Sequence, residues 1–226
     1  MSFDTLARIY RPLEFVLAGD VLQRSRTAYL DRVADCRQAL VLGEGPGRFL
    51  PALLQASPGV RVTCVERSPQ MIAQARRHLP VQDASRVDFV CQDARQWNPP
   101  PDTFDLIVTQ FFLDCFAPEQ VSELVPRLAC AGTSQACWIL SEFQEPASGW
   151  RRVRARLVLA LMYAVFRRVT DISARRLTEP DPFLGRQGFR LMQRQTVNFG
   201  LVRSDLWARR PPEAGREGGS GCKVGA

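Results

Sequence analysis

A glycine-rich turn directly after a short apolar run constrains this chain more than any other feature. The run spans residues 39–42 with the sequence ALVL, and the turn from Gly43 to Gly47 reads GEGPG. Helical spacing of apolar residues resumes over 49–55, so the pattern predicts a strand, a tight turn and a helix. Because glycine lacks Cβ and tolerates positive φ, such a turn lets a ligand approach the backbone closely.

The spacing of the glycines narrows the class of ligand. Gly43, Gly45 and Gly47 form the pattern G-x-G-x-G, whereas the dinucleotide fingerprint G-x-G-x-x-G needs a glycine where this chain has Arg48. We therefore expect a small cofactor rather than a pyrophosphate-bearing dinucleotide, which also disfavours a nicotinamide enzyme.

Strand and helix patterns alternate along the rest of the chain. Ser68 is the expected N-cap of the helix after the second strand, with Pro69 at the first helical position, and another helix is expected over 118–130. The strands expected after the first are 61–65, 87–91, 104–109 and 136–140. Strands that alternate with helices at this spacing imply a parallel sheet with helices on both faces.

The C-terminal part follows a different pattern. After a long helix at 150–169, two strands at 189–195 and 199–207 are separated by a short connection, which makes them an antiparallel hairpin at one edge of the sheet. The predicted fold is therefore α/β: a Rossmann-like, mostly parallel seven-stranded sheet with helices on both faces and an antiparallel C-terminal hairpin.

The positive charge of the chain is concentrated in one segment. The formal net charge is +7, and residues 150–176 alone hold eight arginines against the single acid Asp171, so the rest of the chain sums to zero. A nucleic-acid partner is not expected, because the excess is local rather than spread over a binding face. His78 is the only histidine and the cysteines form no C-x-x-C pair, so no metal site is expected either.

The same segment contains ten apolar residues in succession, 157–166, which would form about 15 Å of helix. A helix on a sheet buries only one face, so this one needs further cover. Three covers are consistent with the pattern: a lid over an apolar acceptor, a homodimer through 150–170, or a membrane surface. The alternative is burial beneath the N-terminal helices and the C-terminal hairpin.

Acidic and aromatic residues after the later strands complete a known pattern. Glu66 ends the second strand, the triplet 92–94 (QDA) follows the third, and 110–114 (QFFLD) follows the fourth. With the glycine turn, these residues would meet at one edge of the sheet, where open α/β sheets bind ligands. At these motifs, over roughly residues 3–145, the chain resembles the class I S-adenosylmethionine-dependent methyltransferases, and within them the ubiquinone/menaquinone-biosynthesis type.

The resemblance implies S-adenosylmethionine as cofactor and assigns residues to it. The glycine turn wraps its methionine part, Glu66 accepts hydrogen bonds from both ribose hydroxyls, Met71 packs on the adenine, and Asp93 bonds the adenine amino group. The cofactor-binding residues implied in this way are Gly43, Glu44, Gly45, Gly47, Glu66, Arg67, Met71, Asp93, Ala94 and Thr109.

One position departs from the family pattern. The family usually has an acid two residues before the first glycine, where this chain has Val41. The methionine ammonium thereby loses its usual nearby charge, and our hypothesis is that Glu44, inside the turn, replaces it.

Two residues are expected beside the reacting methyl group. Tyr10 matches a family tyrosine that closes over the cofactor, and Asp114 lies in the loop that shapes the acceptor site, where it would act as a base or orient the acceptor. The structural alternative for Tyr10 is a half-buried position in the core. For Asp114 it is a helix cap or a solvated acid in the loop. Methyl transfer from a sulfonium is an in-line displacement with a good leaving group, so positioning and exclusion of water can suffice.

The sequence therefore predicts an enzyme that methylates a small, apolar acceptor. The alternatives are an RNA or protein methyltransferase that uses the arginine-rich helix, and a non-catalytic S-adenosylmethionine-binding protein. The sequence shows no secretory leader and no membrane-length apolar run, which predicts a cytoplasmic protein, peripheral if 150–170 contacts a membrane.

The expected parts are a methyltransferase domain at 1–210 and a disordered tail at 211–226. The domain is expected to consist of a helical cap at 1–35, a cofactor-binding core at 36–145, and a long helix plus edge hairpin at 146–210.

Overall fold

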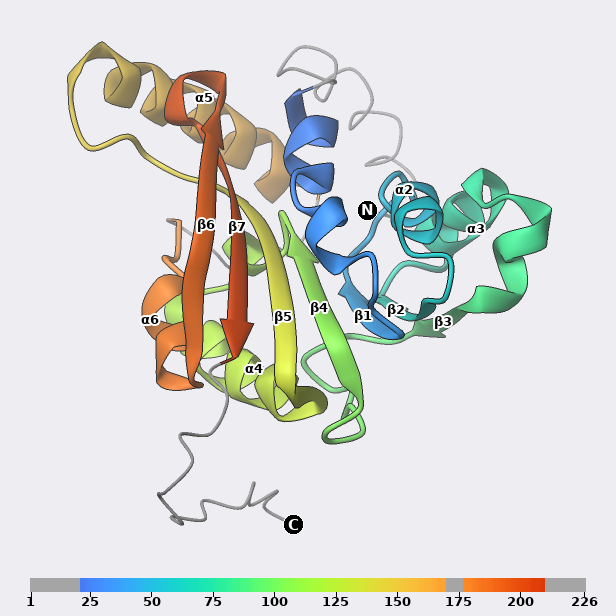
Figure 1. The fold of residues 1–226 in the computed structure, drawn as a ribbon. Coiled ribbons are helices and arrows are strands. Elements are labelled where there is room, and N and C mark those ends of the chain that lie inside the picture. The colour runs from blue at the N-terminus through green and yellow to red at the C-terminus, as the bar shows by residue number, and fades with distance from the viewer. Residues whose placement is uncertain (1–20, 170–176, 210–226) are drawn as a thin grey trace, which may run out of the picture.

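The computed structural model describes residues 21–169 and 177–209. Its centre is a seven-stranded sheet with the order β3-β2-β1-β4-β5-β7-β6 (Figure 1). The strands are β1 (Gln38–Leu42), β2 (Arg61–Glu66), β3 (Val87–Cys91), β4 (Phe104–Gln110), β5 (Gly132–Phe143), β6 (Phe189–Val197) and β7 (Val202–Arg209). Strands β1 to β5 are parallel, and β7 is antiparallel to both β5 and β6. The predicted α/β fold is confirmed.

Helices cover both faces of this sheet. The helical segments are 21–27, η1 (Leu30–Val33), α2 (Leu50–Ala56), α3 (Pro69–His78), η2 (Val81–Arg86), η3 (Leu113–Cys115), α4 (Pro118–Ala131), α5 (Gly149–Val169), α6 (Asp181–Arg186) and η4 (Asn198–Gly200). The predicted cap of α3 is confirmed, since the Ser68 hydroxyl accepts a hydrogen bond from the backbone N–H of Met71 at 3.3 Å.

The side chains of β1 alternate between two hydrophobic cores. Leu40 and Leu42 pack with residues of α4 and α6, whereas Ala39 and Val41 pack with residues of η1 and α2 on the opposite face. All four side chains are at most 1% exposed. Burial on both faces explains why this strand is a continuous apolar run rather than an alternating pattern.

The structure differs from the predicted elements mainly near the C-terminus. The last strand begins at Val202, not at 199, because residues 198–200 form the turn η4. In that turn Asn198, Phe199 and Gly200 all have positive φ. Helix α6 was not predicted; Arg194 on β6 binds both Asp181 of this helix and Asp205 of β7, each at 2.7 Å.

Within the two described ranges, no helix has the length and apolar character needed to cross a membrane. Residues 1–20 of the expected helical cap and the expected tail at 211–226 lie outside the described residues, so the predictions for those segments remain predictions.

Candidate active site

The carboxyl ends of the parallel strands bring the predicted motifs to one edge of the sheet. Strand β1 ends in the glycine turn, β2 ends at Glu66, β3 leads into Asp93, and β4 leads into the loop at 111–115 (Figure 1). The register aligns Leu42 with Val65 on one side and with Thr109 on the other, so these strands end at the same level. This edge is where open α/β sheets bind ligands.

The glycine turn has a conformation that requires glycine at each of its three positions. Gly43, Gly45 and Gly47 have φ of 63°, 65° and 84°, in the left-handed region that other residues avoid. A Cβ on Gly43 would lie 2.5 Å from the ring of Phe112, and one on Gly47 would collide with the Cα of Ala75 in α3. Around Gly45 no atom lies within 4 Å of that position, so this glycine leaves open space at the turn.

Glu66 faces the glycine turn from the end of β2. Its Oε2 accepts a hydrogen bond from the N–H of Gly45 at 3.1 Å, and its Oε1 accepts one from the N–H of Ser68 at 2.9 Å. Burial raises the pKa of this carboxyl group, and the bonds from Ser68 and Gly45 oppose that rise. A carboxylate thus lies against the open glycine of the turn, an arrangement that suits recognition of a vicinal diol.

Glu44 has a structural role that the sequence did not reveal. Its Oε1 accepts the N–H groups of Phe49 at 2.7 Å and Leu50 at 3.4 Å, so the side chain satisfies free amides at the start of α2. Burial raises its pKa to about 7, despite these bonds and the charge of Arg26. The hypothesis that it compensates for Val41, which is buried in the sheet, remains a prediction.

The residues expected around the adenine lie on the next two segments along this edge. Met71 and Ala94 are buried, and Asp93 is partly buried. Arg95 holds the Asp93 carboxylate through its backbone N–H at 2.9 Å and its Nη2 at 2.6 Å, which lowers the pKa of Asp93. Arg67 lies 3.9 Å from the same carboxylate. Asp93 is therefore held ionised, and two arginines balance its negative charge.

Thr109 lies near the end of β4, as predicted, but its side chain points into the core. Its side chain is fully buried, and its hydroxyl accepts a hydrogen bond from Nε1 of Trp138 at 2.8 Å. This places the hydroxyl in the core, because a buried indole N–H needs a partner. We therefore leave the Thr109 side chain out of the proposed site.

Asp114 is buried with a second acid, Glu142 of β5. The Glu142 carboxylate accepts the backbone N–H groups of Leu113 at 2.9 Å and Asp114 at 3.3 Å, and the Asp114 side chain bonds to Glu142 as well. Burial raises the pKa of Asp114 to about 6 and that of Glu142 well above its ordinary value. The alternative of a solvated loop acid is wrong, and 5% exposure fits a positioning role better than that of a base.

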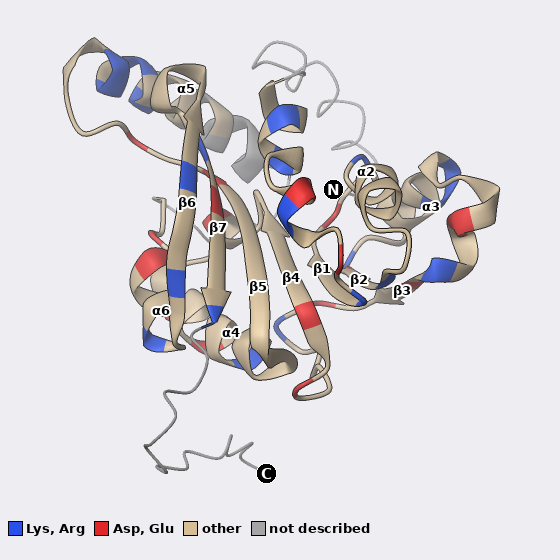
Figure 2. Ribbon diagram, viewed as in Figure 1, with Lys and Arg blue, Asp and Glu red and all other residues tan. Residues whose placement is uncertain are grey.

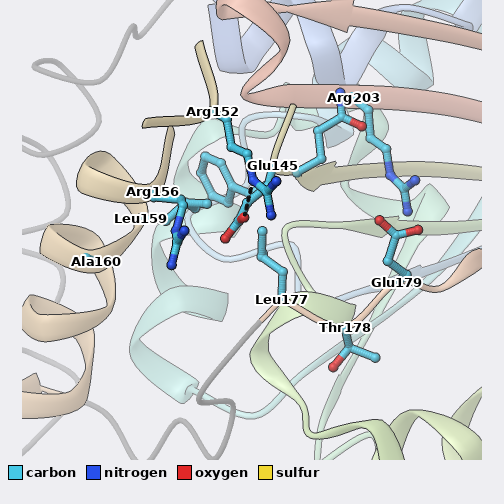
Figure 3. Close-up of a pocket in the computed structure, with 11 residues that line it drawn as sticks. Glu145, Arg152, Arg156, Leu159, Ala160, Leu177, Thr178, Glu179 and Arg203 are labelled. Carbon is cyan, nitrogen blue, oxygen red and sulfur yellow. Dashed lines mark ion pairs between the residues drawn. The ribbon is translucent and has the colours of Figure 1, made fainter. Parts of the chain in front are cut away.

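A cavity of about 590 Å³ lies between the end of β5 and α5 (Figure 3). Its residues are Phe143, Gln144, Glu145, Arg152, Arg156, Leu159, Ala160, Leu177, Thr178, Glu179 and Arg203. The ring of Phe143 packs on Phe111 at 4.9 Å between centroids, and Phe111 directly precedes the Phe112 ring that contacts Gly43. The loop after β4 therefore connects this cavity to the glycine turn.

Part of the chain is similar to known methyltransferases. The model of a methyltransferase domain matches residues 39–131. Over 94 residues the chain is 34% identical to trans-aconitate 2-methyltransferase of Streptomyces avermitilis, and this aligned region is 41% of this chain and 32% of that protein. It is also 29% identical over 110 residues to malonyl-[acyl-carrier protein] O-methyltransferase of Paenibacillus sp., and this aligned region is 48% of this chain and 38% of that enzyme. Residues 39–131 thus match a methyltransferase domain, and these relatives support a class I S-adenosylmethionine-dependent methyltransferase.

Solved structures show the same fold. CalO1, a methyltransferase in calicheamicin biosynthesis with S-adenosylhomocysteine bound, has a TM-score of 0.67 at 19% identity, covering 92% of this chain and 60% of that one. Magnesium protoporphyrin IX methyltransferase of Synechocystis has a TM-score of 0.59 at 20% identity, covering 83% of each chain. The chain spans about a third of the length of the curated relatives it matches. The ubiquinone/menaquinone type remains a prediction.

S-adenosylmethionine is the cofactor of this family, and the described residues fit it. The turn offers an open cradle at Gly45, and Glu66 supplies two carboxylate oxygens beside it. Tyr10 lies outside the described residues. In the described ranges, no three His, Cys, Asp or Glu side chains gather as a metal site would require.

The sequence reasoning missed three parts of this candidate site. Glu142 is the acid partner of Asp114, Arg95 binds Asp93, and Phe112 closes on Gly43. A signal existed for Glu142, since a lone acid within the apolar run 136–143 indicates a buried, partnered carboxyl group. No spacing rule identifies the other two, because their contacts depend on loop conformation.

Proposed function

We propose that this protein transfers the methyl group of S-adenosylmethionine to a small-molecule acceptor at the carboxyl edge of its sheet. The observation that carries the proposal is the pairing of a three-glycine turn with the Glu66 carboxylate, joined by the hydrogen bond from Gly45. When bound, the cofactor supplies a methyl group on a sulfonium, which is already activated toward displacement. The chain therefore needs to bind, orient and exclude water.

The residues divide this task by position. Gly43, Gly45 and Gly47 would contact the methionine part of the cofactor. Glu66 would bind the ribose hydroxyls, and Asp93 would accept a hydrogen bond from the adenine amino group. Around these, Glu44, Arg67, Met71 and Ala94 would complete the cofactor site. Tyr10 remains a candidate lid, and Asp114 with Glu142 would hold the loop on the acceptor side.

The cavity beneath α5 is our candidate for the acceptor pocket. Phe143, Leu159, Ala160 and Leu177 give it apolar walls. Its charges nearly cancel: Arg152 pairs with Glu145 at 3.8 Å, Arg203 binds Asp181 at 2.9 Å, and Arg156 and Glu179 have opposite signs (Figure 3). A small, largely apolar acceptor without net charge suits this lining. It would differ from the acids that appear in the names of the two relatives.

Glu66→Ala is expected to weaken S-adenosylhomocysteine binding about 100-fold or more. The variant removes two charged hydrogen bonds to the ribose, each contributing about 1.5 kcal/mol or more. Isothermal titration calorimetry measures the change. Glu123→Gln, at an exposed position of α4, is the matched control and should bind like the wild type. Equal affinity of the Glu66 variant and the control would contradict the proposed ribose site.

Glu44→Gln distinguishes the two roles of Glu44. If its charge compensates for Val41, the variant binds S-adenosylmethionine several-fold more weakly, while its remaining carbonyl oxygen still accepts the Phe49 N–H. If Glu44 only caps α2, calorimetry would give the wild-type affinity, and the compensation hypothesis would be wrong.

Turnover separates an enzyme from a cofactor-binding protein. Incubating the protein with a cell extract and deuteromethyl-labelled S-adenosylmethionine should label a small metabolite, which mass spectrometry identifies. Label found only in RNA or protein would favour the macromolecular alternative. Tight cofactor binding without any labelled product would favour a non-catalytic role.

A further inference from the structure

The outer face of α5 is apolar and exposed. Trp150, Val153 and Leu157 are 61%, 62% and 68% exposed. At 3.6 residues per turn, these three positions fall within a sector of roughly 60° on the helix surface. Such a row of large apolar side chains in water indicates a surface that contacts something else.

The opposite face of the same helix already has its partners. Ala155, Leu159 and Met162 are at most 4% exposed and pack in one cluster with Leu201 and Val202. Helix α5 thus has two apolar faces, and within the described residues only the inner one is covered. Packing against the protein's own core does not explain the outer row.

The turn between β6 and β7 extends this row. Phe199 is 56% exposed, and its ring lies 5.6 Å from that of Trp150 between centroids. Its φ of 57° is unfavourable for a residue with a side chain, and Arg154 holds the turn by donating to Oδ1 of Asn198 at 3.0 Å. We call Trp150, Val153, Leu157 and Phe199 the α5 patch.

Arginines surround the α5 patch without acids among them. Residues 150–160 contain Arg151, Arg152, Arg154 and Arg156 and no Asp or Glu, and the basic bands on α5 are visible in Figure 2. Glu145 pairs with Arg152 at 3.8 Å, and Glu179 lines the same cavity as Arg156, which leaves Arg151 and Arg154 without an acid in this stretch of helix. Any partner of the patch must therefore accept apolar side chains and positive charge together.

We propose that the α5 patch docks onto an anionic lipid surface. Tryptophan, leucine and phenylalanine enter the boundary between headgroups and acyl chains, while arginines keep their guanidinium groups at the headgroups. Negative headgroups supply the counter-charge that these arginines do not find on the helix. A two-fold contact with a second copy would place the same arginines against each other, so charge favours the lipid over a dimer.

The position of α5 gives this docking a consequence for the proposed function. The helix lines the acceptor cavity through Arg152, Arg156, Leu159 and Ala160. Docking its outer row would bring that cavity beside the bilayer, where an apolar acceptor accumulates. This consequence depends on the proposed function, whereas the docking itself does not.

Vesicle co-sedimentation of the full chain tests the proposal. The protein should bind vesicles of phosphatidylcholine mixed with phosphatidylglycerol, and much less to phosphatidylcholine alone, with binding that weakens as salt rises. The double variant Arg151→Gln/Arg156→Gln should lower partitioning about 30-fold, at about fivefold for each arginine. Trp150→Ala/Leu157→Ser should lower it about tenfold or more through lost apolar contact.

Matched controls come from the exposed strand β6. Met192→Ser and Arg190→Gln change an exposed apolar residue and an exposed arginine outside the α5 patch and should bind as the wild type. The proposal is overturned by absent binding, by equal binding to both vesicles, or by equal losses in the β6 controls. It is also overturned if sedimentation shows a dimer that Trp150→Ala dissociates. Because lipid binding needs no acceptor or cofactor, failure here leaves the proposed methyl transfer intact.

Discussion

Replacing Gly47 by alanine is expected to lower the free energy of unfolding by about 2 to 5 kcal/mol. Its φ of 84° costs a residue with a side chain about 1–2 kcal/mol. The added Cβ also collides with the Cα and Cβ of Ala75, so α3 must move away from the turn, at a further cost of about 1–3 kcal/mol. Urea unfolding followed by circular dichroism measures the loss.

Gly45→Ala is the matched control for this change. It has a similar φ of 65°, but nothing lies within 4 Å of its added Cβ, so it should lose only about 1–2 kcal/mol. Similar losses in both variants would contradict a close packing of α3 on the turn. The two variants should also differ in cofactor binding, because Gly45 borders the open space beside Glu66 and Gly47 does not.

The strand pattern and the glycine turn were predictable because each follows from local chemistry. Alternation of apolar runs with capped helices predicted the parallel strands β1 to β5, and the Ser68-Pro69 start of α3 was correct to the residue. The rule that parallel strands end at one edge then placed Glu66 and Asp93 at the same edge of the sheet as the turn. These inferences need no knowledge of distant contacts.

Contacts between distant segments were not predictable in the same way. Thr109 was expected to bind the cofactor, but Trp138, 29 positions later, donates a hydrogen bond to its hydroxyl in the core. The start of β7 at Val202 depends on positive φ at Asn198 and Phe199, and of these two residue types only asparagine often adopts it. Side-chain direction and loop conformation are fixed by packing. Sequence patterns therefore predict the strands and helices better than they predict the contacts within the site.

The pair formed by Asp114 and Glu142 shows how such a contact changes an interpretation. Both carboxyl groups are at most 5% exposed and lie beside each other, so burial and mutual repulsion oppose their joint ionisation. Near neutral pH we expect the folded pair to hold one proton between its two carboxyl groups. The pair accepts backbone amides of the loop after β4, which ties the position of that loop to the charge on the two acids.

The pair predicts a specific pH dependence of stability. The pKa of Asp114 is about 6 in the folded chain, against an ordinary value of 3.8, so between these values the folded chain binds more protons than the unfolded one. Its contribution to stability is therefore present at low pH and is lost as pH rises through about 6.

Asp114→Asn removes this dependence while keeping a side chain of the same shape that can donate to Glu142. The free energy of unfolding of the variant, relative to the wild type, should rise by roughly 2–3 kcal/mol from about pH 4 to about pH 8. Urea titrations at several pH values measure it, with Asp88→Asn, an exposed acid of β3, as a control whose difference from the wild type stays constant. If the Asp114 variant also ran parallel to the wild type, the two acids would not share a proton, and Glu142 would hold the loop as a fixed acceptor.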